Sequence, residues 1–435
     1  MIGLLRRERA IEPPVTSMVQ CPLLELLSPS RPRDGPPIRM GSDGALVRLG
    51  AQEEVVVKRS VHRRTIGATG SEIAGPGQID LRYVAWAAAV ETMQVNLVAR
   101  GWVGLFGAML DPSTTDLVWR GQGPGGEAEI KRAYSALMGR FFGRAVLRSE
   151  HRIKWLQQAS EGLEVQPGVH VFRKAGAQYA GDLPDWVGWD RARRMWAVCE
   201  AKGSYGSTRW MNGEPEPVTT ALRQIDRIEF RDAAGPIASE GWVVASRWGT
   251  IDNGRPPVIM TVDPRNDGRV LSHDEARRAE GELRVDWYAG LLSAVGQEPV
   301  AERLRSGAAA TADDDRGLAR IGDMVGYAAL AIDGAGLFPM AGDERGDLRR
   351  ALLRFARDRG RKTALIVIDR NCVEVARSRE IDGQAALKFD HTDLPSLDET
   401  AAAEDASADG LDNSAFTQDG VTLTWEPDRL DFTAL

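Results

Sequence analysis

Residues 181–206, GDLPDWVGWDRARRMWAVCEAKGSYG, carry the pattern that decides the fold. Two strand-like runs flank a polar turn at residues 190–194. A hairpin about that turn pairs positions whose numbers sum to about 385, which places Asp185 opposite Glu200. Because side chains alternate along a strand, Glu200 and Lys202 share one face. The pattern therefore predicts that Asp185, Glu200 and Lys202 converge.

The opposite face of the second run carries Ala197, Cys199 and Ala201, small apolar residues that predict packing on a helix. On the polar face, two close carboxylates are costly to ionise together unless a cation lies between them. Mg²⁺ characteristically takes one or two carboxylates together with waters and a substrate phosphate, and it lowers the pKa of a bound water. A lysine beside the metal orients that water or neutralises developing charge. This chemistry suits the cutting of a phosphodiester.

Helices and strands are predicted on both sides of the hairpin. In chain order they are a helix at 128–149, three strands at 169–174, 183–189 and 195–202, a helix at 218–231, and strands at 241–247 and 257–262. A helix over 272–295 closes this part of the chain. The order helix, three strands, helix, strand predicts an α/β fold.

The hairpin resembles the PD-(D/E)xK nuclease superfamily, whose fold is called restriction-endonuclease-like. Pro184-Asp185 followed by Glu200-Ala201-Lys202 carries the resemblance, and it extends over residues 128–262. Gln224 stands where many members have a helix glutamine that assists the site. A second triplet, Glu129-Ile130-Lys131, has no such hairpin and is interpreted as helix surface.

The resemblance implies a metal site formed by Asp185, Glu200 and the carbonyl of Ala201, with Lys202 at the attacking water. Its cofactor is Mg²⁺, with Mn²⁺ as a substitute. The implied enzyme is a metal-dependent deoxyribonuclease, an endonuclease rather than an exonuclease. Many members also use a glutamate of the first helix, and Glu150 is the nearest candidate.

Other interpretations of the same residues stay open. The hairpin could be exposed and hold only an incidental ion pair, or the fold could have kept these residues for structure. The rival function is a non-catalytic nucleic-acid-binding or assembly subunit, for example in a defence or phage-derived system. A catalytic site needs a partly exposed carboxylate pair, whereas a scaffold would bury or ion-pair it.

Charge is uneven along the chain. The net charge is -7, but residues 390–435 hold twelve acids and one base, a net of -11. Residues 131–210 hold fourteen Lys or Arg against seven Asp or Glu, and only seven of the 55 basic residues are Lys. A basic segment is typical of nucleic-acid binding, and DNA is the expected partner. The candidate contacts are Arg140, Arg144, Arg191, Arg193, Arg194, Arg209 and Trp210.

Five segments are expected along the chain. They are an extended, partly ordered leader (1–80), a helical entry with the nuclease-like core (81–300), a linker (301–317), a small α/β unit (318–396) and a partly disordered acidic tail (397–435). The α/β unit is expected to contain a helix at 347–358 and strands at 363–368 and 372–376, and it could bind a protein partner. Three distant cysteines and no apolar run of about 20 residues favour a cytoplasmic protein with no membrane association.

Overall fold

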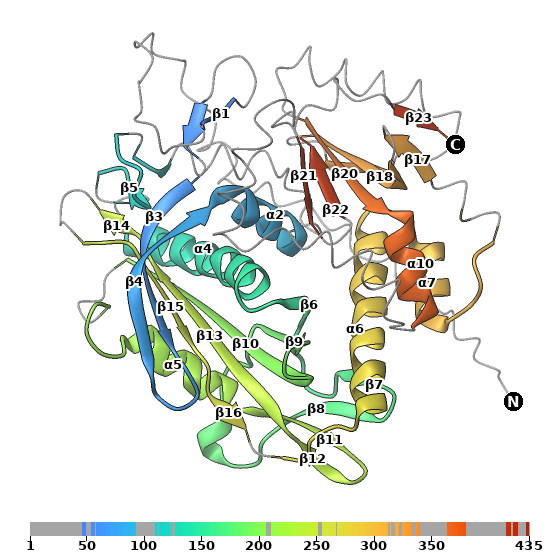
Figure 1. Cartoon of the computed structure of the whole chain (residues 1–435), viewed down its shortest axis with the longest axis horizontal. Helices are drawn as coiled ribbons and strands as arrows, with labels where there is room; N and C mark the ends of the chain where they lie inside the picture. Colours follow the sequence, from blue (N-terminus) through green and yellow to red (C-terminus); the bar gives the residue numbers. More distant parts are fainter. Residues whose placement is uncertain are drawn as a thin grey trace, which may run out of the picture. The chain divides into compact units, whose positions relative to one another are not determined.

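The structure is a computed structural model of the 435-residue chain. It describes residues 46–48, 54–56, 58–92, 109–111, 113–121, 123, 127–205, 210–250, 255–266, 268–311, 314, 318–321, 324–332, 336–339, 363–379, 415–418, 421–424 and 432–434. Within them the chain is mixed α/β (Figure 1). None of the helices in these ranges is both long and apolar enough to cross a membrane.

A mixed eight-stranded sheet positions the candidate site. Its order is β4-β3-β15-β13-β10-β9-β6, and β16 also pairs with β13. The strands are β3 (Lys58–Ile66), β4 (Glu72–Asp80), β6 (Ile153–Gln158), β9 (Trp186–Asp190), β10 (Met195–Ser204), β13 (Ser239–Arg247), β15 (Val258–Val262) and β16 (Arg265–Asn266). β10 runs parallel to β13, and β15 runs parallel to β3. Every residue of β13 and β15 is buried, as in strands covered on both faces.

Helices cover both faces of this sheet (Figure 1). The long helix α4 (Ala128–Ser149) packs on one face of β10, and α2 (Leu81–Thr92) packs on α4. On the other face lies α5 (Glu216–Ile225), whose apolar side chains join those of β10 and β13 in a second core cluster. α6 (His273–Ala294) begins with a capping box formed by Ser272 and Glu275, and α7 (Glu298–Ser306) follows it.

A separate four-stranded sheet departs from the predicted strand order. It contains β7 (Glu164–Gln166), β8 (Val169–Arg173), β11 (Ile228–Asp232) and β12 (Gly235–Ile237) in the order β12-β11-β8-β7. The predicted strand at 169–174 therefore exists as β8 but lies outside the main sheet. The place beside β9 is taken by β6, whose ladder is irregular between Lys154 and Gln157. The short helix η2 (Ala177–Tyr179) links β8 to the hairpin.

Two other predicted boundaries were wrong. The helix expected at 218–231 ends at Ile225, because Ile228 and Phe230 alternate inward as strand residues of β11. Residues 58–80, assigned from the sequence to an extended leader, form β3 and β4. The helix expected after residue 80 is α2, and its continuation past Thr92 lies outside the described residues.

A seven-stranded sheet forms near the C-terminus, in the order β21-β22-β20-β18-β17-β23 with β19 beside β18. Its strands are β17 (Leu318–Ile321), β18 (Met324–Ile332), β19 (Gly336–Pro339), β20 (Thr363–Asp369), β21 (Ala415–Gln418), β22 (Val421–Thr424) and β23 (Phe432–Ala434). Residues 372–376, predicted as a strand, belong to helix α10 (Arg370–Ser378), which the Asp369 side chain caps. The helix predicted at 347–358 lies outside the described residues.

Two short strand pairs complete the described elements. β1 (Leu46–Arg48) pairs with β2 (Glu54–Val56), and β5 (Val118–Trp119) pairs with β14 (Gly249–Thr250).

Candidate functional site

The β9–β10 hairpin has the register that the sequence predicted. Trp186 faces Cys199 and Asp190 faces Met195, so paired numbers sum to 385. Asp185 stands one residue before the first ladder pair, at the level of Glu200. The polar turn lies at the other end of the hairpin, so the two carboxylates lie away from it.

The small apolar face of β10 packs on α4, as expected from Ala197, Cys199 and Ala201. All three side chains are buried in the core cluster that includes Phe141 and Phe142 of α4. The approach is closest at Gly203, where an added Cβ would lie 1.6 Å from the Ser135 carbonyl oxygen. This contact fixes α4 against the end of β10 that carries Glu200 and Lys202.

Two hydrogen bonds between side chain and backbone link Asp185 to Glu200 and Ala201 across the hairpin. The Asp185 amide donates to Glu200 Oε2 at 2.8 Å, and the Ala201 amide donates to Asp185 Oδ2 at 2.9 Å. Lys202 forms an ion pair with Glu200 Oε1. The side chains of Asp185, Glu200 and Lys202 are 15%, 1% and 25% exposed. The structure therefore brings the three predicted residues together, with one carboxylate almost fully buried.

The electrostatics of the pair follow from this burial. Burial, together with the negative charge of Asp185, raises the pKa of Glu200 to about 7 against the lowering effect of Lys202. Burial also raises the pKa of Asp185, although Arg140 opposes that rise. A further cation beside Asp185 and Glu200 would favour the state in which both carboxylates are ionised.

Glu91 also belongs to this cluster, and the sequence reasoning missed it. Arg140 Nε donates to Glu91 Oε1 at 2.9 Å, and Arg140 also pairs with Asp185 Oδ1. Arg144 Nε lies 3.0 Å from Glu91 Oε2, and Trp186 Nε1 donates to the same oxygen at 3.2 Å. Burial alone would raise the pKa of Glu91, but the two arginines bring it below its usual value. Its one sequence signal is that it is the single acid in the sequence of α2.

Two residues suggested by the resemblance have other surroundings. Glu150 follows α4 and pairs with Arg63 of β3, so it is not part of the carboxylate cluster. Gln224 of α5 is buried and donates to the Leu183 carbonyl at 3.4 Å. Gln224 thus supports the segment that leads into Asp185.

The described arginines proposed to contact nucleic acid are paired with groups of the protein itself. Arg140 and Arg144 bind Glu91. In the hairpin turn, Arg191 lies near Glu280, Arg193 bonds Glu240 and Asp263, and Arg194 contacts His273.

Arg209 lies outside the described residues. Trp210 is fully buried, below the guanidinium of Arg247 and with its carbonyl bound by Arg64, so its ring is not available to stack on a base.

The donors at the site fit a hard divalent cation. Two carboxylates and the Ala201 carbonyl are oxygen ligands of the kind Mg²⁺ takes, with waters completing its shell. In the part of the chain that the structure describes, no three His, Cys, Asp or Glu side chains are close enough to hold a metal by themselves. Asp185 and Glu200 would therefore share the ion with water and substrate rather than enclose it.

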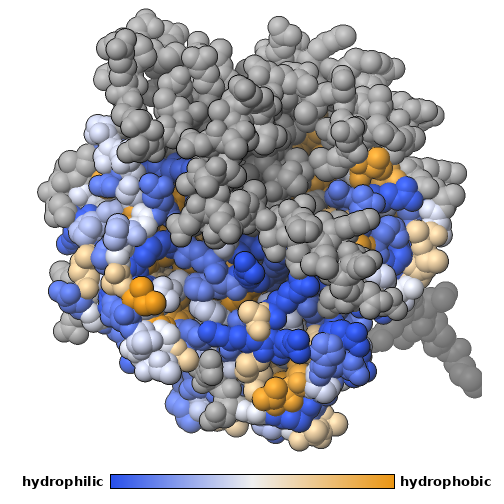
Figure 2. Space-filling view, viewed as in Figure 1, coloured by the Kyte–Doolittle hydropathy of each residue, from blue (hydrophilic) through white to orange (hydrophobic). Residues whose placement is uncertain are grey.

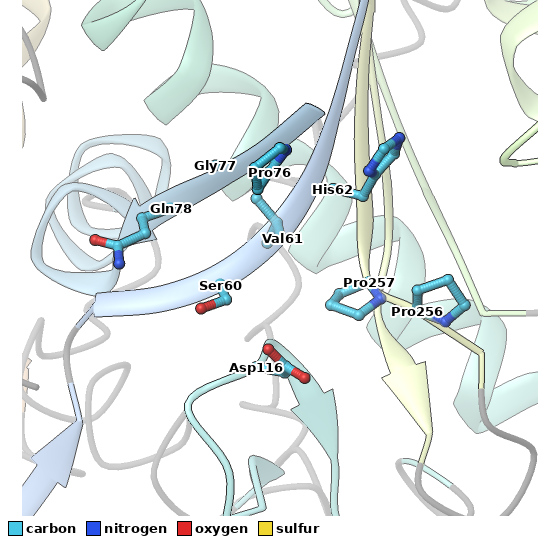
Figure 3. Close-up of a pocket in the computed structure, with 9 residues that line it drawn as sticks. All are labelled: Ser60, Val61, His62, Pro76, Gly77, Gln78, Asp116, Pro256 and Pro257. Atoms are coloured by element: carbon cyan, nitrogen blue, oxygen red, sulfur yellow. The ribbon is translucent and has the colours of Figure 1, made fainter. Parts of the chain in front are cut away.

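A cavity of about 490 Å³ lies elsewhere, where β3 and β4 meet the start of β15 (Figure 3). Val61, Pro76 and Pro257 line it together with the polar His62 and Asp116. In the sheet, β3 is separated from β10 by β15 and β13, so this cavity is distinct from the carboxylate pair.

On the face of the molecule that Figure 2 shows, the described surface is mostly hydrophilic with separate apolar spots.

No protein-family model, no curated protein and no solved structure was found to match the chain.

Proposed function

We propose that the chain is a metal-dependent nuclease of the PD-(D/E)xK type that cleaves DNA. The observation that carries the proposal is the meeting of Asp185, Glu200 and Lys202 at one end of the β9–β10 hairpin. The element order supports it, because α4, β6, β9, β10, α5 and β13 follow the sequence helix, three strands, helix, strand. β10 and β13 are also the parallel pair of that set.

In this proposal Asp185, Glu200 and the Ala201 carbonyl hold Mg²⁺, and Mn²⁺ can replace it. When bound, the metal supplies a water of lowered pKa and stabilises negative charge on the phosphate. Lys202 Nζ, next to Glu200, orients the attacking water and balances the charge that develops. Gln224 holds the chain before Asp185 through the Leu183 carbonyl.

A second function is a non-catalytic subunit that binds nucleic acid or a protein through the same fold. One observation favours it: Glu200 is almost fully buried, and both carboxylates are already paired with Arg140 or Lys202. A scaffold that kept these residues for stability would have this arrangement.

Mg²⁺-dependent cleavage of DNA decides between the two functions. Glu200→Ala and Lys202→Ala should each abolish cleavage, because they remove a metal ligand and the charge beside the attacking water. The second triplet offers a matched control, since Glu129 is an exposed acid two residues before a lysine on α4. Glu129→Ala should cleave like the wild type. Equal cleavage by all four proteins refutes the assignment, and no cleavage by any of them supports the scaffold.

A further inference from the structure

Arg140 holds two acids at once. It projects from α4, where its Nε and Nη2 atoms bind Glu91 Oε1 and its Nη1 atom binds Asp185 Oδ1. The guanidinium carbon lies 4.7 Å from the centre of the Trp186 ring. A planar guanidinium over an aromatic face is a favourable arrangement.

The partners of Arg140 differ in how firmly they are held. Glu91 also has an ion pair with Arg144 and a hydrogen bond from Trp186 Nε1, and neither contact involves Arg140. Arg144 is buried and also donates to the Leu156 carbonyl at 3.2 Å. The Arg140 side chain is 30% exposed. Glu91 therefore has partners of its own, and Arg140 is the most exposed of the three cations in the cluster.

The cluster is electrically balanced by its own residues. Three acids, Glu91, Asp185 and Glu200, face three bases, Arg140, Arg144 and Lys202. Asp185 Oδ2 is taken by the Ala201 amide, and Asp185 Oδ1 is the oxygen that Arg140 binds. A divalent cation at Asp185 would lie next to the guanidinium in a largely buried site, where like charges repel strongly.

We propose that Arg140 is a built-in counter-ion that competes with the divalent cation for Asp185, so that metal binding requires Arg140 to leave this carboxylate while Glu91 retains it. This inference rests on the proposed metal site. It assigns Arg140 a regulatory role, because the affinity for the metal depends on how readily Arg140 leaves Asp185. It also accounts for the ion-paired state of the carboxylates without a loss of function.

The test measures metal binding rather than activity. Mn²⁺ is titrated into the full chain and free Mn²⁺ is followed by electron paramagnetic resonance, for wild type, Arg140→Gln and Arg140→Lys. Arg140→Gln should bind Mn²⁺ at least about tenfold more tightly, a difference of about 1.4 kcal/mol. Arg140→Lys should lie between the two, because a single ammonium reaches only one of the two acids. Arg132→Gln is the matched control, since it removes an exposed arginine from the same helix and should bind as wild type does.

Thermal unfolding gives a second readout. Without metal, Arg140→Gln should unfold at a lower temperature than wild type, because Asp185 loses its cation, and Mn²⁺ should raise its unfolding temperature by more than it raises that of wild type. If Arg140→Gln does not fold, Arg140→Lys carries the test in the same direction. Equal or weaker Mn²⁺ binding by the variants overturns the inference but leaves the nuclease proposal standing. No Mn²⁺ binding by any of the proteins overturns both.

Discussion

Gly203→Ala should destabilise the chain strongly, because Gly203 lies where β10 touches α4. A Cβ at this position would lie 1.6 Å from the Ser135 carbonyl oxygen and 3.0 Å from the Gly139 amide nitrogen. The contact is reciprocal, since a Cβ on Gly139 would lie 2.3 Å from the Gly203 amide nitrogen. The obstacle on each side is backbone, so no side chain can turn away to make space.

The size of the effect follows from these distances. Ordinary contact begins at 3.4 Å, so the strand and helix must separate by about 1.8 Å to admit the methyl group. Overpacking typically costs about 1–3 kcal/mol, and a backbone obstacle places Gly203→Ala at about 3 kcal/mol or above. The same shift would move Arg140 and Lys202 apart, because they stand next to Gly139 and Gly203 on the two separated elements.

Urea unfolding followed by tryptophan fluorescence measures the change. Gly290→Ala is the matched control, because Gly290 lies inside helix α6 with nothing within 4 Å of an added Cβ. That variant should gain about 0.5–1 kcal/mol from helix propensity alone. If Gly203→Ala unfolds at the same urea concentration as wild type while Gly290→Ala behaves as expected, the close packing of β10 on α4 is wrong.

Two further predictions concern buried side chains outside the carboxylate pair. Burial and a hydrogen bond with Asp190 raise the pKa of Glu240 from 4.5 to about 7. The protonated side chain therefore contributes stability that is fully present below pH 4.5 and is lost as the pH rises through 7. Glu240→Gln should remove up to about 3 kcal/mol of that pH dependence, seen as the difference between urea unfolding at pH 5 and pH 8, and parallel pH profiles of the two proteins would contradict it. Trp210→Ala should cost about 3–5 kcal/mol because the ring is fully buried, while DNA affinity of the folded variant at low temperature stays unchanged. A loss of affinity without a loss of stability would restore Trp210 as a base-stacking residue.

The parts of the site that were predictable are those encoded within one hairpin. A polar turn with alternating flanks fixes a register, and the register alone places Asp185 at the level of Glu200. The two faces of β10 follow from the same alternation. Ala197 and Cys199 lie on one face of the sheet, and Val198 and Glu200 lie on the other. Neither step needs information from outside residues 181–206.

The parts that were not predictable depend on contacts between distant segments. Glu91 reaches Arg140 across 49 positions, and nothing local marks it as the partner of that arginine. β3 joins the main sheet by pairing in parallel with β15, a contact between residues near 62 and residues near 258. The sequence of β11 predicts a continuation of helix α5, but these residues form a strand because they pair with β8. In each case the tertiary partner overrides the local pattern.

Deleting the acidic tail would not test the effect of its charge alone. β22 pairs with β20, β21 pairs with β22, and β23 pairs with β17, so deleting residues 397–435 would take three strands from the C-terminal sheet. The charge can be changed without that damage. Six acids lie before β21 in a segment outside the described residues: Asp398, Glu399, Glu404, Asp405, Asp409 and Asp412.

Changing these six acids to their amides should tighten DNA binding severalfold at low salt, if the tail competes with phosphates for basic side chains. The effect should fade at higher salt, because screening shortens the Debye length from about 30 Å at 0.01 M to about 10 Å at 0.1 M. A scrambled segment 397–414 with all six charges kept is the control and should bind as wild type does. Labelled duplex titrated at two salt concentrations gives the answer: equal affinity of the neutralised and scrambled proteins at low salt means that the tail does not reach the DNA-binding surface.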